Sequence, residues 1–172
     1  NKSGGTLITK EDNSLESALI SGITCSNDDS KIILRNVPDT PGIAAKILSP
    51  ISEAGIDVDV IVQNVGSDKS TDFTFTVKND LSEKAAKILK DLTEGFGGGE
   101  VELVKDVSKV SVVGVGMKSH AGVAAQMFGA LANKKINIDM ISTSEIKISV
   151  VVAKDKAEEA VIALHDEFEL DK

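Results

Sequence analysis

Residues 31–48, "KIILRNVPDTPGIAAKIL", combine a β-rich run, a tight turn and a helical pattern, and this combination decides the fold. A similar stretch, "KVSVVGVGMKSHAGVAAQMF", occupies residues 109–128, and further along Asp59 matches Asp139. Equivalent residues lie 78 positions apart before the turn and 80 after it, so the second turn is two residues longer. Such internal similarity indicates a duplicated structural unit.

Both copies predict the same order of elements: strand, helix, strand, strand, helix. The spacing of apolar residues predicts helices over 41–54 and 121–134. In "TDFTFTV", polar and apolar residues alternate as they do in a strand with one solvent-exposed face. The remaining expected elements are strands at 32–37, 58–64, 72–78, 110–115, 138–143 and 146–152, and helices at 82–94 and 155–167.

Capping residues mark the expected helix ends. We expect the side chain of Thr40 to cap the first helix, with Pro41 in its first turn and Gly42 allowing a close approach to the backbone. Ser82 and Asp155 are the expected caps of the later helices. Gly55 is expected to end the first helix, because glycine readily adopts the left-handed conformation needed there.

Only the first copy closes with a further strand, residues 99–107. The β-prone residues 18–28 have no counterpart in the first copy, so they either connect domains or supply the missing strand of the second copy. We favour the second interpretation, because a sheet without that strand has an open edge. It predicts an α+β fold of two ferredoxin-like βαββαβ units, with antiparallel sheets, helices on one face, and the first unit inserted into the second. The predicted divisions are a linker or upstream remnant at 1–17, unit 1 at 30–106, and unit 2 at 18–29 plus 107–172.

The composition excludes several classes of partner. The net charge is −8, with 19 basic and 27 acidic residues, which argues against nucleic acid and against an anionic membrane surface. No apolar stretch reaches the ~20 residues that span a bilayer. Cys25 is the only cysteine, which excludes an intrachain disulfide and a cysteine-based zinc cluster. We expect Cys25 to be a small buried hydrophobic residue, and we expect a cytoplasmic protein.

Sequence motifs for catalysis are missing. There is no phosphate-binding P-loop and no H-E-x-x-H motif, and neither His120 nor His165 belongs to a Ser/His/Asp pattern. The stretch "GVGMKS" at 114–119 has Ser119 where a dinucleotide-binding fingerprint has its third glycine. These observations favour a binding module over an independent enzyme.

The turn at residues 39–44 has the chemistry to bind a free amino acid. N–H groups at the start of a helix suit a carboxylate, and Asp39 suits the neighbouring ammonium group. A helix terminus contributes only about 0.3–2 kcal/mol, whereas millimolar affinity needs roughly 4 kcal/mol. Gln63, Asn64 and Thr74 are therefore expected to contribute as well. Taken singly, Asp39 is equally explained as a cap of the turn and Gln63 as a solvated amide.

The second turn predicts different contacts, because Met117 stands where the first turn has Asp39. Thr143, Ser144 and Glu145 could meet an ammonium group, or they could close a tight hairpin.

The motifs "PDTPGIAAKIL", "GMKSHAGVAAQMFGAL" and "NIDMISTSEIKISVVV" resemble the C-terminal regulatory region of aspartate kinases over nearly the whole chain. This resemblance implies two ACT domains that bind threonine, lysine or both as feedback inhibitors of the ATP-dependent phosphorylation of the aspartate side-chain carboxylate. It also implies homodimers that hold effectors where ACT domains meet. ATP, Mg and the catalytic site are expected on a kinase domain, so no cofactor is expected in this chain.

The resemblance also implies two sets of effector-binding residues. The first set is Asp39, Gly42, Ile43, Ala44, Ile56, Asp57, Asp59, Gln63 and Asn64. The residues themselves add Thr40 in the turn and Thr74 in the next strand to this first site. The second set is Met117, Ser119, His120, Ala121, Gly122, Val123, Asn137, Ile138, Asp139, Thr143 and Glu145. An alternative without any effector also stays open, namely a constitutive subunit whose sheets only hold an oligomer together.

Overall fold

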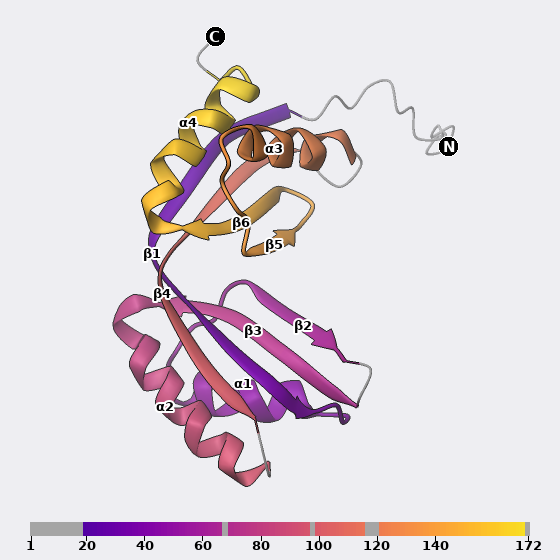
Figure 1. Ribbon diagram of the computed structural model, residues 1–172, viewed down its shortest axis with the longest axis vertical. Coiled ribbons are helices and arrows are strands. Elements are labelled where there is room, and N and C mark those ends of the chain that lie inside the picture. Colours follow the sequence, from indigo (N-terminus) through magenta and orange to yellow (C-terminus); the bar gives the residue numbers. More distant parts are fainter. Residues whose placement is uncertain (1–18, 67–68, 97–98, 116–120, 171–172) are drawn as a thin grey trace, which may run out of the picture.

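The computed structural model describes residues 19–66, 69–96, 99–115 and 121–170, which form one sheet covered by helices (Figure 1). In chain order, the elements are β1 (Leu19–Pro38), α1 (Ile43–Glu53), β2 (Ile61–Val65), β3 (Ser70–Lys78), α2 (Asn79–Gly95), β4 (Glu100–Val115), α3 (Ala121–Asn133), β5 (Met140–Thr143), β6 (Lys147–Ala153), a 3-10 turn η1 (Lys154–Lys156) and α4 (Ala157–Glu167).

Two long strands, β1 and β4, pair antiparallel and extend through both units (Figure 1). The sheet order is β2-β3-β1-β4-β6-β5. We expected separate strands at 18–28 and 32–37, and again at 99–107 and 110–115. Both expectations are corrected, because each pair of segments is one continuous strand.

The first half of β1 completes the sheet of unit 2. Leu19–Ser26 pair with Lys109–Val115 of β4, and β6 lies on the other side of this part of β4. The strand order is therefore β2-β3-β1-β4 in unit 1 and β1-β4-β6-β5 in unit 2. This confirms the predicted βαββαβ plan, since the described part of the segment predicted at 18–28, residues 19–28, contributes a strand and not a connector. Because β1 and β4 run unbroken through both units, the residue boundaries between the units stay a prediction.

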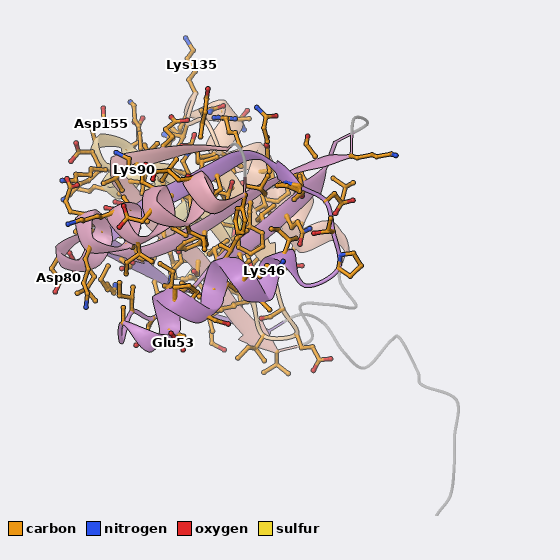
Figure 2. All side chains as sticks on the ribbon, turned by 90° about the horizontal axis from the view of Figure 1, so that it is seen from below. Lys46, Glu53, Asp80, Lys90, Lys135 and Asp155 are labelled. Atoms are coloured by element: carbon orange, nitrogen blue, oxygen red, sulfur yellow. The ribbon has the colours of Figure 1, made fainter. Side chains whose placement is uncertain are left out.

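Each unit has its own hydrophobic core between the sheet and its two helices. In unit 1, Ile47 of α1 and Leu89 of α2 pack against Phe75 of β3, and all three are fully buried. In unit 2, Met127 of α3 and Leu164 of α4 are fully buried in the same way. The outer helix surfaces carry charged side chains that point into solvent, as Figure 2 shows for α1 and α2.

The helix ends agree only partly with the predicted caps. Gly55 has φ 72° directly after α1, which confirms it as the terminating residue. Ser82 does not cap α2, because the helix begins three residues earlier at Asn79 and the Ser82 hydroxyl donates to the Asn79 carbonyl (2.7 Å). Asp155 lies in the 3-10 turn before α4 and makes no capping hydrogen bond.

Cys25 is exposed, which corrects the expectation of a buried residue. Within the described part of the chain, this part of β1 forms the edge of the unit 2 sheet and pairs only with β4. The Cys25 thiol donates to Asn27 Oδ1 at 3.2 Å. Partial burial and, secondarily, the Asp29 carboxylate raise the pKa of this thiol, which makes it a poor nucleophile. Among the described helices, none combines the length and apolar character that crossing a bilayer requires.

Candidate functional site

The turn between β1 and α1 is closed by backbone groups. Gly42 adopts φ 88° and ψ 0° just before the first helical residue, and no side chain caps the helix. The Ile43 N–H donates to the Thr40 carbonyl at 3.1 Å. The predicted side-chain cap by Thr40 is therefore wrong, since the backbone of this residue closes the turn in its place.

A pocket of about 410 Å³ opens at this turn, and its volume is in the range of small-molecule sites. It is lined by Asp39, Thr40, Pro41, Gly42, Ile43, Ala44 and Gln63. Six of the residues predicted for the first site are thus brought together, five from the turn and one from β2.

The pocket combines an acidic group with free hydrogen-bond donors. Asp39 is exposed, and its carboxylate makes no ion pair or hydrogen bond with the described residues. The N–H groups of Gly42 and Ala44 likewise have no partner among the described residues, as is usual for the first turn of a helix. The Ile43 N–H is already occupied, so it is not available to a ligand as predicted.

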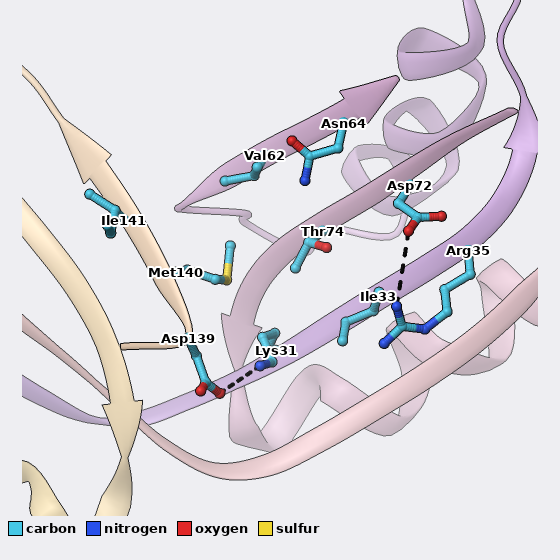
Figure 3. A pocket seen from close by; sticks show the side chains of 10 residues that line it. All are labelled: Lys31, Ile33, Arg35, Val62, Asn64, Asp72, Thr74, Asp139, Met140 and Ile141. Carbon is cyan, nitrogen blue, oxygen red and sulfur yellow. Dashed lines mark hydrogen bonds and ion pairs between the residues drawn. The ribbon is translucent and has the colours of Figure 1, made fainter. Parts of the chain in front are cut away.

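Gln63 and Asn64 lie on opposite faces of β2, because successive side chains of a strand alternate. Gln63 lines the pocket at the turn, whereas Asn64 lines a second hollow of about 340 Å³ on the helix-free face (Figure 3). The second hollow is lined by Lys31, Ile33, Arg35, Val62, Asn64, Asp72, Thr74, Asp139, Met140 and Ile141. The predicted residues Asn64, Thr74 and Asp139 therefore belong to a different hollow from Asp39.

The charges of this second hollow are paired with each other. Lys31 Nζ lies 2.6 Å from Asp139 Oδ2, and Arg35 lies 3.9 Å from Asp72 (Figure 3). Arg35 also donates to Glu102 at 2.9 Å, and this hydrogen bond is the main cause of its raised pKa. A ligand in this hollow would have to compete with these pairs, so the turn pocket is the better candidate site.

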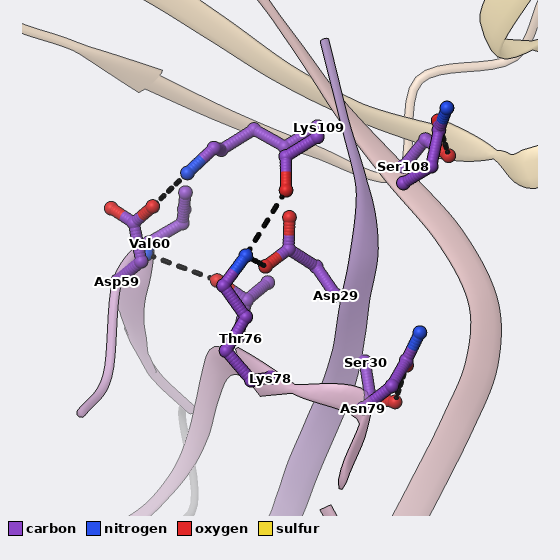
Figure 4. A network of polar contacts seen from close by, with 11 residues as sticks. Asp29, Ser30, Asp59, Val60, Thr76, Lys78, Asn79, Ser108 and Lys109 are labelled. Atoms are coloured by element: carbon purple, nitrogen blue, oxygen red, sulfur yellow. Dashed lines mark hydrogen bonds and ion pairs between the residues drawn. The ribbon is translucent and has the colours of Figure 1, made fainter. Parts of the chain in front are cut away.

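The predicted segment before β2 does not line the turn pocket. Ile56 is buried in the core of unit 1, and Asp57 is exposed. Asp59 forms an ion pair with Lys109 of β4 (Figure 4). Lys31 and Lys109, the lysines of these cross-unit pairs, were not among the predicted site residues, although they begin the two copies of the repeat.

The second predicted site is only partly described. Met117, Ser119 and His120 lie outside the described residues, and Ala121 is described only as the first residue of α3. Gly122 is exposed at the start of α3, and Val123 is buried in the unit 2 core. The other members lie along the segment through β5: Asn137, which donates to Asp139 at 3.4 Å, partly buried Ile138, and exposed Thr143 and Glu145.

Among the described residues, no group of three or more His, Cys, Asp or Glu side chains could hold a metal ion. His165 is half-buried on α4, as expected of a boundary residue.

Comparisons with known proteins agree with the two-unit architecture. A family model described as the ACT domain matches residues 32–94 and, in a second version, residues 110–168. An aspartate kinase of Pseudomonas fluorescens (strain SBW25) is 56% identical over 168 residues, covering 97% of this chain and 41% of that protein. The chain therefore spans about two-fifths of the length of the curated relatives it matches.

Solved structures give the same result. The ligand-free regulatory subunit of aspartate kinase from Thermus thermophilus is 41% identical with a TM-score of 0.83, and the match covers 87% of this chain and 99% of that one. A structure of aspartokinase alpha and beta subunits is 42% identical with a TM-score of 0.81, again covering 87% and 99%.

Proposed function

Because this chain belongs to the ACT-domain regulatory regions of aspartate kinases, we propose that it binds a free amino acid at the β1–α1 turn and thereby controls a catalytic kinase domain. The observation that carries this proposal is the pocket in which an unpaired carboxylate faces solvent beside free helix N–H groups. A zwitterionic amino acid offers an ammonium group to Asp39 and a carboxylate to the N–H groups of Gly42 and Ala44.

We propose L-threonine as the ligand of this pocket. Asp39 is the one acidic side chain among the lining residues, and the α-ammonium group of any amino acid would occupy it. A second ammonium group, as lysine carries, would lack a carboxylate there, whereas the Gln63 amide suits a hydroxyl group. We accordingly assign lysine to the second turn, whose sequence has Met117 where the first turn has Asp39.

The pocket needs a cover to reach useful affinity. A helix terminus contributes about 0.3–2 kcal/mol, and a Kd of 1 mM corresponds to roughly 4 kcal/mol. We propose that a second copy of the chain supplies this cover. Strand β2, which carries Gln63, is an edge strand with exposed Ile61 (45%) and Val65 (64%). Edge strands with apolar side chains favour pairing with another chain.

The activity under control is the ATP-dependent phosphorylation of aspartate, which we assign to a catalytic domain or subunit that binds ATP and Mg. Effector binding regulates such a domain only if the effector binds its two states with different affinity. The competing proposal is a constitutive assembly subunit, and the exposed edge of β2 is the observation in its favour.

Calorimetric titration of the chain with L-threonine, L-lysine and L-methionine tests the proposal. At a threonine concentration of 100 Kd, mass action stabilises the fold by about 2.7 kcal/mol, or roughly 5–10 °C in Tm for a chain of this size. Methionine serves as the control without a side-chain hydroxyl or ammonium group. No heat and no stabilisation with threonine or lysine, together with a dimer affinity that ignores both in sedimentation experiments, would establish the assembly subunit.

A further inference from the structure

The two units are related by an approximate two-fold axis that passes between β1 and β4. Asp29 lies opposite Val107 in this antiparallel pair, and the two residues are equivalent positions of the repeat, 78 residues apart. Where equivalent residues face each other, the surrounding residues are exchanged by a two-fold rotation. A contact between the units that uses equivalent residues must therefore occur twice.

Two ion pairs between the units follow this axis. Lys31 of unit 1 pairs with Asp139 of unit 2 at 2.6 Å (Figure 3), and Lys109 of unit 2 pairs with Asp59 of unit 1 (Figure 4). The two lysines are equivalent in the repeat, and so are the two aspartates. Each unit thus offers its lysine to the aspartate of the other, and we call the two contacts the reciprocal ion pairs.

The reciprocal ion pairs are more shielded than ordinary surface pairs. The lysine side chains are only 11% and 17% exposed, whereas Asp139 and Asp59 are 30% and 49% exposed. Loss of an aspartate would therefore leave a poorly solvated lysine charge. Beside them, Val60 and Met140 pack in an apolar cluster with Val107 and Val151. Charge pairing and apolar contact together hold the units in one relative orientation.

Asp59, which pairs with Lys109, is connected to the turn pocket through β2. The Asp59 N–H donates to the Thr76 carbonyl at 3.0 Å, and four residues later Gln63 lines the pocket. A ligand that draws Gln63 toward itself would therefore move β2, and with it the preceding residue Asp59, relative to Lys109. In unit 2, Asp139 holds the equivalent place before β5, and its N–H donates to the Val151 carbonyl at 2.8 Å.

We propose that the reciprocal ion pairs transmit ligand occupancy from one unit to the other, with Lys31 and Lys109 as positioning residues. The proposal rests on amino-acid binding at the turn pocket. When β2 moves on binding, the Lys109–Asp59 pair rearranges. The Lys31–Asp139 pair joins the same two units, so a change in the relative orientation of the units alters this pair as well. Occupancy of the unit 1 pocket thereby alters the segment before β5 in unit 2.

Amide chemical shifts of the full chain, recorded during a titration with L-threonine, test this transmission. The measured signal is a change in the amide shifts of α3, β5 or β6. If the substitution Asp39→Ala removes this change, the change is caused by binding at the unit 1 pocket. We expect this signal to be lost in the double variant Lys31→Met and Lys109→Met, while shifts at residues 39–44 persist. The matched control is Lys105→Met, which breaks an exposed pair with Glu83 inside unit 1 (2.6 Å).

A charge swap distinguishes an effect of the lost ion pairs from an effect of misfolding in the double variant. Lys109→Asp combined with Asp59→Lys restores one pair with reversed polarity, and we expect it to retain the transmitted shifts. No shift at residues 39–44 of the unaltered chain, with threonine or lysine, would overturn the proposed function itself. Shifts confined to unit 1 would overturn the transmission alone, as would transmitted shifts that survive in the double variant.

Discussion

The substitution Gly42→Ala isolates the conformational role of the turn beside the pocket. Gly42 has φ 88°, and a Cβ added there meets no heavy atom within 4 Å, so alanine would cause no clash. The left-handed conformation costs an alanine about 1–2 kcal/mol, and the smaller entropy of the unfolded chain offsets about 0.4–1 kcal/mol. We therefore expect the free energy of unfolding to fall by roughly 1 kcal/mol.

The repeat supplies a matched control for this substitution. Gly122 is the equivalent glycine, but it lies within α3 without a positive φ, and a Cβ there also meets nothing within 4 Å. Gly122→Ala should therefore stabilise the chain, by up to about 1 kcal/mol from helix propensity. Urea unfolding followed by circular dichroism measures both variants. The reasoning fails if Gly42→Ala is as stable as the parent chain, or if both substitutions shift stability in the same direction.

Three further predictions concern the ligand, a surface pair and the core. Asp39→Asn should weaken threonine binding about 10- to 150-fold, the value of a charged hydrogen bond; calorimetry measures this, and Asp91→Asn on the outside of α2 should leave the affinity unchanged. The Lys105 hydrogen bond lowers the pKa of Glu83, so this pair stabilises the fold above the ordinary glutamate pKa and ceases to do so as the pH falls through the lowered value. Lys105→Met should return the Glu83 pKa toward its ordinary value in an NMR titration, and an unchanged value would contradict the pairing. Met127→Ala should destabilise the chain by about 2–5 kcal/mol in thermal unfolding, whereas Met127→Leu should cost less than about 1.5 kcal/mol.

The repeat and the apolar spacing predicted the order of elements, because these patterns depend on local chemistry. They did not predict that β1 is continuous, because residues 25–31, "CSNDDSK", are rich in turn-forming residues. Pairing on both sides overrides that preference, since Asp29 lies between Lys78 of β3 and Val107 of β4.

The candidate site was predictable where its residues are close in sequence, as around Asp39 and Gly42. It was less predictable where the direction of a side chain decides, because the adjacent Gln63 and Asn64 belong to different hollows. The repeat also identifies Asp59 and Asp139 as equivalent without showing that each pairs with a lysine of the opposite copy. That pairing depends on the rotation relating the two copies, which only the paired strands β1 and β4 define.

The shared strands have a consequence for the order of events during synthesis of the chain. Every element of unit 1 has been made once residue 107 has left the ribosome, so this unit can fold while translation continues. Unit 2 cannot fold at that stage, because its edge strand is translated before unit 1 and its remaining elements are translated after unit 1. Residues 19–26 therefore stay unpaired until residues 109–115 have been synthesised. Stalled or truncated products would consequently contain a folded first unit and an exposed orphan strand, which is a template for aggregation.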